Sequence, residues 1–282
     1  MQRLSLREVD MSVAGGLIFM HAGCLLAPLH FTPGAAAVFL AGIWLFGGLG
    51  ICLGFHRLLT HRAFKAPRWL ERTLAVLGCV AWQGSPVQWA AVHRTHHRDS
   101  DGPVDPHSPQ ESFWWGHMLW ILQKRPIDRP VEEVAKDLLQ DPFMRWLHKW
   151  FWTLQLPLAA ALYLVGGLPW VVWGIFVRTT VVWHGTWLIN SAAHRWGYAN
   201  FDLGDGSRNL WWVALLTFGE GWHNNHHHHP SAATHGLRWW EIDVTGLTIR
   251  LLRRLGVVDA VIDHRGRSLP DPDGSGISPA GP

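Results

Sequence analysis

Three short clusters of histidine stand out among the 19 histidines of this 282-residue chain. Neutral imidazole is the commonest nitrogen ligand for transition metals, and dense clusters in an otherwise apolar protein indicate a polynuclear metal centre. The function is therefore expected to reside at this centre. The clusters are His56-Arg-Leu-Leu-Thr-His61, His93-Arg-Thr-His96-His97 and His223-Asn-Asn-His226-His227.

The spacing within each cluster indicates which side chains can meet. The second and third clusters share the offsets i, i+3 and i+4, which place three imidazoles on one face of a helix. His56 and His61 are five residues apart, roughly 140° around a regular α-helix, so we expect them where a helix ends or bends. Asn190 and His194 form a further i, i+4 pair near the end of an apolar stretch.

The number of candidate ligands exceeds the needs of one ion. A structural zinc site needs four ligands and a catalytic zinc site three plus water. Two metal ions with mostly nitrogen ligands fit better, and open positions could then bind dioxygen. Iron and zinc both remain open, because imidazole serves both. The candidate ligands are His56, His61, His93, His96, His97, His194, His223, His226, His227 and Asn190.

Other polar residues receive structural interpretations. Asp99, Asp101 and Asp105 lie in turn sequence, so we expect caps and hydrogen bonds from them, not metal ligation. Arg178 lies in an apolar stretch that is expected to cross a membrane, where an ionisable group is costly. It is therefore a candidate functional residue, although its side chain could equally snorkel to the membrane surface or pair with an acidic group. The histidines expected to be structural are His21, His30, His107, His117, His148, His184, His235 and His264, and His228 and His229 merely extend the third cluster.

Uncharged stretches predict that the chain crosses a membrane. Hydrophobic residues make up 48% of the chain and charged residues only 16%, unlike most soluble proteins. A helix needs roughly 20 apolar residues to cross a bilayer, and Pro and Gly mark turns between such stretches. The expected spans are about residues 13–31, 35–55, 150–168 and 170–190, arranged as two hairpins.

The distribution of Lys and Arg predicts the orientation of these spans. Both hairpin tips lack Lys and Arg, and nearly all basic residues lie near the termini or between the hairpins. Under the positive-inside rule both termini and all three histidine clusters are cytoplasmic. The formal net charge of +3 then reflects topology and attraction to anionic lipid, not binding of nucleic acid.

The expected fold is an all-α integral membrane protein with four transmembrane helices and a cytoplasmic helical cap that holds the histidines. Two helices between Arg68 and His97 are expected to lie against the membrane. A mixed-charge helix is expected at 131–139 and an amphipathic helix near 247–255.

We assign residues 1–265 to a single domain. Residues 266–282 are rich in Pro, Gly and Ser and are expected to form a disordered tail. The three cysteines lie in apolar segments without CxxC spacing, so we expect buried thiols and neither ligands nor disulfides. These cysteines are Cys24, Cys52 and Cys79.

The three clusters resemble the histidine boxes of the membrane-bound fatty acid desaturases, specifically a bacterial-like form of the Δ9, stearoyl-CoA-type branch. The third box reads Gly219-Glu220-Gly221-Trp222 and then the histidine cluster, and Asn190-Ser-Ala-Ala-His194 is similar to the additional ligand motif of that branch. The resemblance implies a di-iron centre that uses dioxygen and two electrons to form a cis double bond in a saturated acyl chain. It also implies that Asn190 acts on the metal through a water, and it supplies no separate acid or base residue.

The resemblance extends to substrate-binding positions. Residues similar to those that bend the acyl tunnel of the family are Gln83, Trp89, Thr186 and Trp187. Lys124 and Arg125 lie near the positions that bind CoA phosphates in animal members. Ala91-Val92, however, replaces an Arg-Asp pair that contacts CoA there, so acyl-CoA and acyl-lipid both remain possible substrates.

Partners and location follow from the same resemblance. The sequence has no His-Pro-Gly-Gly heme motif, so electrons are expected from a separate ferredoxin, rubredoxin or cytochrome b5-type carrier with its reductase. A basic surface could dock such a carrier or bind anionic lipid, and it lies near Arg238, Arg250, Arg253 and Arg254. The expected location is a bacterial inner membrane.

Two alternatives remain open from the sequence. The same histidine architecture could hydroxylate a lipid or alkane. A histidine-rich metal transporter or sensor is a second alternative, but it predicts ligands inside the spans and facing both sides, whereas the clusters here lie beyond the span ends on one side.

Overall fold

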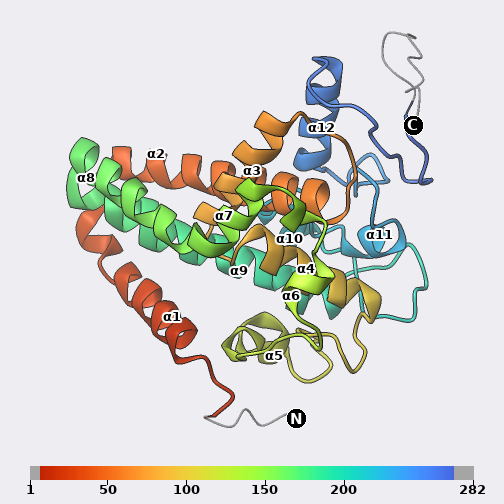
Figure 1. Cartoon of the computed structure of the whole chain (residues 1–282), viewed down its shortest axis with the longest axis horizontal. Coiled ribbons are helices and arrows are strands. Elements are labelled where there is room, and N and C mark those ends of the chain that lie inside the picture. Colours follow the sequence, from red (N-terminus) through yellow and green to blue (C-terminus); the bar gives the residue numbers. More distant parts are fainter. Residues whose placement is uncertain (1–6, 270–282) are drawn as a thin grey trace.

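The computed structural model describes residues 7–269 as a helical protein, and within those residues only isolated bridges occur and no β-strand forms. The expectation for residues 270–282 of the tail lies outside the described residues. The α- and π-helices of the described residues are α1 (Met11–Cys24), α2 (Pro33–Gly42), the π-helix η2 (Ile43–Thr60), α3 (Arg68–Val80), α4 (Pro86–Arg98), α5 (Phe113–His117), α6 (Val131–Val134), α7 (Pro142–Trp150), α8 (Gln155–Val171), the π-helix η6 (Val172–Val177), α9 (Arg178–Ser191), α10 (Trp211–Leu216), α11 (His223–His228) and α12 (Val244–Arg254) (Figure 1).

Two apolar helical elements are long enough to cross a membrane by length and composition. The first runs unbroken through α2 and η2 over 28 residues, and the second covers Pro142–His194. The second element is broken at Gly167, whose φ of 65° and ψ of −160° leave the helical region. Beyond this break Gly174 lies against Leu162, so the chain turns back and forms a hairpin.

The first expected span is shorter than the sequence suggested. Helix α1 covers 14 residues and ends at Cys24, and a 3₁₀ turn with Pro28 near its start follows at Ala27–His30. A proline lacks the N–H that would continue the α-helix, which explains the early end. Residues 13–31 are therefore not one continuous helix.

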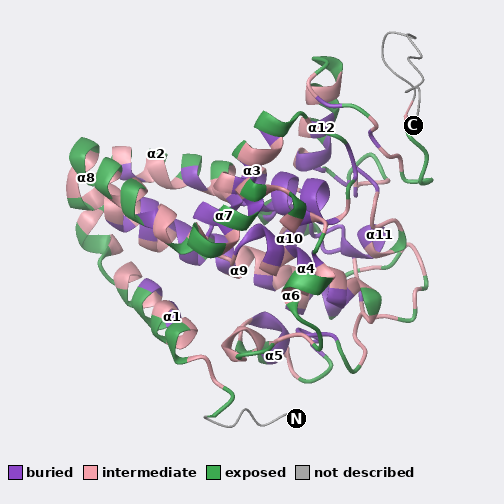
Figure 2. Ribbon diagram, in the orientation of Figure 1, coloured by how far each residue is buried: buried purple, intermediate pink, exposed green. Residues whose placement is uncertain are grey.

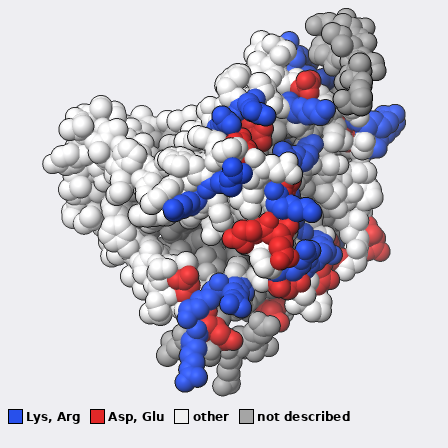
Figure 3. Space-filling model, in the orientation of Figure 1, with Lys and Arg blue, Asp and Glu red and all other residues white. Residues whose placement is uncertain are grey.

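The surface divides into an apolar end and a charged end. The tips of α2 and α8 lie side by side, far from α11 and α12 (Figure 1). At this end of the molecule Figure 2 shows exposed residues, and Figure 3 shows no Lys, Arg, Asp or Glu on the visible face. The exposed side chains include Leu164 and Val165 of α8, so this end of the molecule has an apolar surface.

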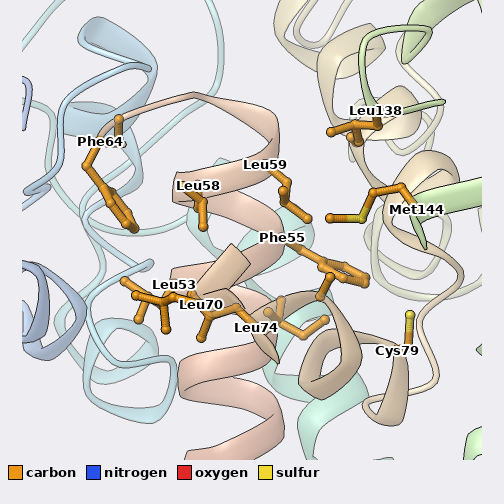
Figure 4. Packing of buried hydrophobic residues seen from close by; sticks show 14 of the residues in the cluster. Leu53, Phe55, Leu58, Leu59, Phe64, Leu70, Leu74, Cys79, Leu138 and Met144 are labelled. Atoms are coloured by element: carbon orange, nitrogen blue, oxygen red, sulfur yellow. The ribbon is translucent and has the colours of Figure 1, made fainter. Parts of the chain in front are cut away.

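A tightly packed core positions the first histidine box. Leucines and Phe55 of η2 pack against Leu70 and Leu74 of α3 (Figure 4). A Cβ at Gly50 would lie 2.6 Å from the backbone nitrogen of Gly78, so the two helices cross in close contact. This crossing fixes the direction in which η2 presents the residues that follow Phe55.

The smaller expected elements are mostly confirmed. Helices α3 and α4 occupy the region from Arg68 to Arg98, and α12 occupies the expected amphipathic segment. Ser85 begins α4 with a capping box, because its side chain accepts from the Gln88 N–H and the Gln88 side chain accepts from the Ser85 N–H. The helix expected at 131–139 is wrong in length, since α6 ends at Val134.

We expect Gly50→Ala to destabilise the protein by about 1–3 kcal/mol, because the added methyl group meets the α3 backbone. Gly16→Ala is the matched control, since nothing lies within 4 Å of a Cβ at that helical position. Thermal unfolding in detergent would compare the two variants with the wild type. Equal midpoints for all three proteins would contradict the close crossing of η2 and α3.

Candidate metal centre

His56 and His61 lie at the end of η2, where the helix is wound as a π-helix. In such a helix each N–H bonds to the carbonyl five residues earlier, and the His61 N–H donates to the His56 oxygen at 3.1 Å. Residues five apart therefore lie on the same side, and their rings meet with centroids 4.8 Å apart. The expectation of a helix end or bend is confirmed, with π-winding as its form.

Helix α4 divides its three histidines between two clusters. The Nε2 atoms of His93 and His97 lie 3.1 Å apart, whereas the Nε2 atom of His96 lies 3.2 Å from that of His227 in the other cluster. Helix α11 does the reverse, because its first and last box histidines share the cluster of His96 and its middle histidine joins the other. Each of the two helices thus contributes to both clusters.

The imidazole nitrogens form two compact groups, each with all ligand atoms within 4.8 Å of one another. The first cluster is His56, His61, His93, His97 and His226, and the second cluster is His96, His194, His223 and His227. The recorded Nε2 contacts within the clusters are 2.9–3.2 Å long. Two nitrogens that bind one ion at about 2.1 Å and at right angles lie about 3.0 Å apart, so this spacing suits a metal ion.

Carboxylates hold the outward nitrogen of four ligand histidines. An ionised carboxylate only accepts hydrogen bonds, so each Nδ1 carries the proton and each Nε2 lone pair faces the cluster. The Asp101 and Asp105 contacts confirm the expected hydrogen-bonding role. The Nδ1-to-oxygen pairs are His56 with Glu220 at 2.8 Å, His96 with Asp105 at 2.8 Å, His194 with Asp101 at 3.0 Å and His227 with Asp205 at 2.8 Å.

Two further buried histidines lie behind these carboxylates. The His235 Nδ1 lies 3.0 Å from Glu220, and the His107 Nδ1 lies 3.5 Å from Asp105. Both are among the histidines expected to be structural, and their spacing in the sequence does not place them beside the clusters. The two-residue spacing from Asp105 was a weak local signal for His107, whereas His235 meets Glu220 only through the tertiary fold.

Burial favours the neutral form of seven of the nine ligand histidines. Desolvation lowers the pKa of His93, His97 and His223 well below the ordinary value, and neighbouring histidines lower it further. Burial alone would raise the pKa of Glu220, but the charge of Arg57 helps to hold it well below its ordinary value. The centre therefore combines neutral imidazoles with ionised carboxylates at neutral pH.

The fixed charges around the clusters suit two divalent cations. Arg57 is fully buried and contacts both Glu220 and Asp243. Five carboxylates and this one guanidinium leave a net charge of −4 around neutral imidazoles, equal and opposite to the charge of two divalent ions. The five carboxylates are Asp101, Asp105, Asp205, Glu220 and Asp243. The donor set and the charge both fit a two-metal centre.

An apolar cavity of about 430 Å³ reaches this centre. Its walls come mainly from η2, α9 and α10, and its lining includes His56 and His93 of the first cluster, His223 of the second cluster and Asn190. A long apolar ligand in this cavity would contact the histidine clusters directly. Of the helices that line the cavity, η2, α4 and α11 also carry ligand histidines.

Three of the four predicted tunnel residues lie together. Trp89 and Thr186 line the cavity, and Gln83 stands behind them. The Gln83 side chain donates to Thr186 Oγ1 at 2.9 Å and accepts from Trp89 Nε1 at 3.3 Å. Trp187 is buried outside the lining, where it packs against the rings of His117 and His184.

The predicted head-group residues do not join the cavity lining. The Lys124 ammonium donates to the Arg7 carbonyl at 2.8 Å, and Arg125 is exposed. Arg178, a functional candidate from the sequence, is fully buried and donates to Gly174 O, Val80 O and Gln155 Oε1. These neutral acceptors give Arg178 a structural role within the helical bundle.

Three of the histidines expected to be structural, His21, His117 and His184, form one chain of contacts through α9. His184 bridges His21 of α1 and His117 of α5, with nitrogen separations of 3.1 and 2.9 Å. This chain of rings ties the first helix to α9. The described cysteines are free, as expected, although Cys24 is only partly buried.

Comparison with known proteins identifies relatives across most of the chain. Residues 30–243 match the family model described as fatty acid desaturase. The sn-2 palmitoyl-lipid 9-desaturase of Nostoc sp. (strain 36) is 49% identical over 246 residues, or 86% of each chain. The sn-1 stearoyl-lipid 9-desaturase of Anabaena variabilis is 48% identical over 86% of this chain and 90% of its own. The acyl-CoA C20 Delta5-desaturase of Anemone leveillei is 45% identical over 86% of this chain and 78% of its own.

We expect Asp205→Ala to weaken Fe²⁺ binding about 10- to 100-fold, because His227 loses the carboxylate that fixes its ring. Competition with a calibrated chelator would measure the affinity without requiring turnover. Asp202→Ala, at an exposed position of the same loop, should bind Fe²⁺ like the wild type. An unchanged affinity in Asp205→Ala would show that this carboxylate does not support a ligand.

Proposed function

This chain belongs to the fatty acid desaturase family, and from that premise we propose that it introduces a cis double bond into a long saturated acyl chain. One observation carries the proposal: a single apolar cavity ends on ligand histidines of both clusters. In the balanced reaction, two adjacent methylenes lose one hydrogen each. Dioxygen accepts these hydrogens together with two electrons and two protons, and two water molecules form.

The nine clustered histidines would hold two iron ions, and Asn190 would join the second cluster through a water. Iron would supply the oxidising power that an unactivated methylene requires. The donor set supports this assignment, because the first cluster contains five imidazoles and exceeds the four ligands of a structural zinc site. The carboxylate-bound Nδ1 protons keep four of the rings oriented toward the ions.

The protein itself would contribute to the reaction by positioning the acyl chain and by excluding water from the histidines. Apolar side chains of η2, α9 and α10 would hold the substrate by burial and exclude water from the histidines. Gln83, Thr186 and Trp89 satisfy one another's polar groups, so they can shape the wall without attracting water. We assign to this trio the bend that selects the methylene pair and favours the cis product, with Trp187 supporting the wall from behind.

The relatives support formation of the double bond at C9. Both cyanobacterial relatives are named 9-desaturases that act on acyl-lipids, and their matches cover most of this chain. Ala91-Val92 at the position of the animal CoA contact also favours an acyl chain carried in a lipid. We therefore propose an acyl-lipid substrate, with acyl-CoA as the comparison in any assay.

We further propose a single desaturase domain over residues 1–265 with four spans and with both termini and the metal centre in the cytoplasm of a bacterium. The charge-free end in Figure 3 and the hairpin that Gly167 forms support this arrangement. Electrons would come from a separate carrier protein. The exposed Arg250 and Arg254 of α12 offer a basic surface to such a carrier or to anionic lipid.

We expect a bacterial host that expresses the wild-type chain to accumulate a cis-9 monoene, and we expect His96→Ala to abolish it. His96→Ala should also reduce the bound iron from two ions to one, because the second cluster loses a ligand. His228→Ala, next to that cluster but stacked on Phe201, is the control that should retain product and iron. Mass spectrometry would locate the double bond and measure the metal.

Full product formation by His96→Ala would remove this residue from the ligand set. Hydroxylated lipids from an iron-loaded wild type would favour the hydroxylase alternative over desaturation.

We expect Gln83→Ala to broaden the position of the double bond, because Thr186 and Trp89 lose their shared hydrogen-bond partner. A new Δ8 or Δ10 product should reach about one tenth or more of the monoene, which corresponds to a remaining discrimination of about 1.4 kcal/mol or less. Gln140→Ala, an exposed position, is the control. Pure Δ9 product from Gln83→Ala would exclude the trio as the bend.

A further inference from the structure

The cavity that ends on the histidine clusters also opens on the outside of the molecule. Three of its lining side chains are largely exposed: Val181 is 43% exposed, Leu215 is 70% exposed and Leu216 is 57% exposed. Side chains inside a closed cavity could not be exposed to this extent. These three residues therefore mark an opening between α9 and α10, which we call the lateral mouth.

The lateral mouth is apolar, unlike the opposite end of the cavity. The polar lining includes Glu220 and the ligand histidines, and no Lys or Arg of the described residues lines the cavity. Near the mouth, Trp211, one helical turn before Leu215 on α10, is 65% exposed. A phosphate-rich carrier such as CoA needs cationic partners, and the lateral mouth supplies none.

The depth of the lateral mouth matches that of hydrocarbon. Val181 lies inside the proposed span at 170–190, and Gly47, which also lines the cavity, lies inside the proposed span at 35–55. Phe218, which follows α10, packs beside Gly47, so α10 lies against the spans at this level. An apolar opening at that depth faces lipid chains and not water.

We propose that the lateral mouth admits the acyl chain of a membrane glycerolipid directly from the bilayer into the cavity. The chain then reaches the metal centre without leaving an apolar environment, and the head group stays at the membrane surface. This inference rests on the proposed function for what happens to the chain afterwards, but the entry step itself needs neither dioxygen nor electrons.

Photolabelling of the full chain in lipid nanodiscs tests this entry step. The probe is phosphatidylglycerol whose palmitoyl chain carries a diazirine near its middle, and mass spectrometry locates the label after irradiation. In the wild type we expect label on the cavity segment that contains Gly47 and Ile51. Val181→Trp combined with Leu215→Trp should reduce that label at least tenfold. Leu164→Trp, an exposed position on α8 outside the cavity lining, should not change it.

A second variant covers the case in which the double substitution fails to fold. Leu215→Cys, modified with a bulky maleimide after reconstitution, blocks the lateral mouth in protein that has already folded, and maleimide-treated wild type controls for Cys24. Undiminished labelling of the cavity segment in either blocked protein would overturn the lateral mouth. Labelling that depends on an open mouth, in a wild type that forms no monoene, would support the mouth and count against the proposed desaturation.

Discussion

A single buried guanidinium fixes the relation between the first and third histidine boxes. Arg57 follows His56 in the chain, is fully buried, and donates to Glu220 and through both Nη atoms to Asp243. Glu220 precedes the third box and holds His56, while Asp243 caps α12 by accepting from the Gly246 N–H. Loss of one partner from a buried charged pair costs about 3–5 kcal/mol, so the geometry of the centre depends on this network.

The same network explains why the centre is suited to cations. His96 and His227, whose Nδ1 protons are both held by carboxylates, direct their Nε2 lone pairs at each other across 3.2 Å. Lone pairs at that distance repel unless a cation lies between them, and the surrounding charge of −4 increases the affinity for one. Binding of metal would therefore be coupled to folding around the clusters, as in other sites whose ligands come from distant parts of a chain.

The sequence was informative where function follows local spacing, and uninformative where it follows tertiary contact. The i, i+3, i+4 boxes predicted helices that carry ligands, and α4 and α11 are such helices. Spacing could not show that His96 and His97 serve different clusters, because that depends on where the two helices cross. It also missed His235, which meets Glu220 only through the fold. The continuous first span was wrong because the turn at Pro28 outweighs hydropathy.

An acyl chain offers the protein almost nothing to recognise, since its methylenes differ only in their distance from the two ends. An apolar pocket distinguishes one methylene from the next by only about 1–3 kcal/mol. Because the cavity is open at the lateral mouth, no closed end there limits how far the acyl chain can move along it. A rigid feature next to the histidines would therefore have to set the position of reaction. On the function proposed above, Gln83 and Thr186, joined at 2.9 Å between the α3–α4 connection and α9, would provide such a feature. The reacting methylenes carry no polar group that the protein could bind. Hydrogen-bonded residues beside an apolar wall would fix their position instead.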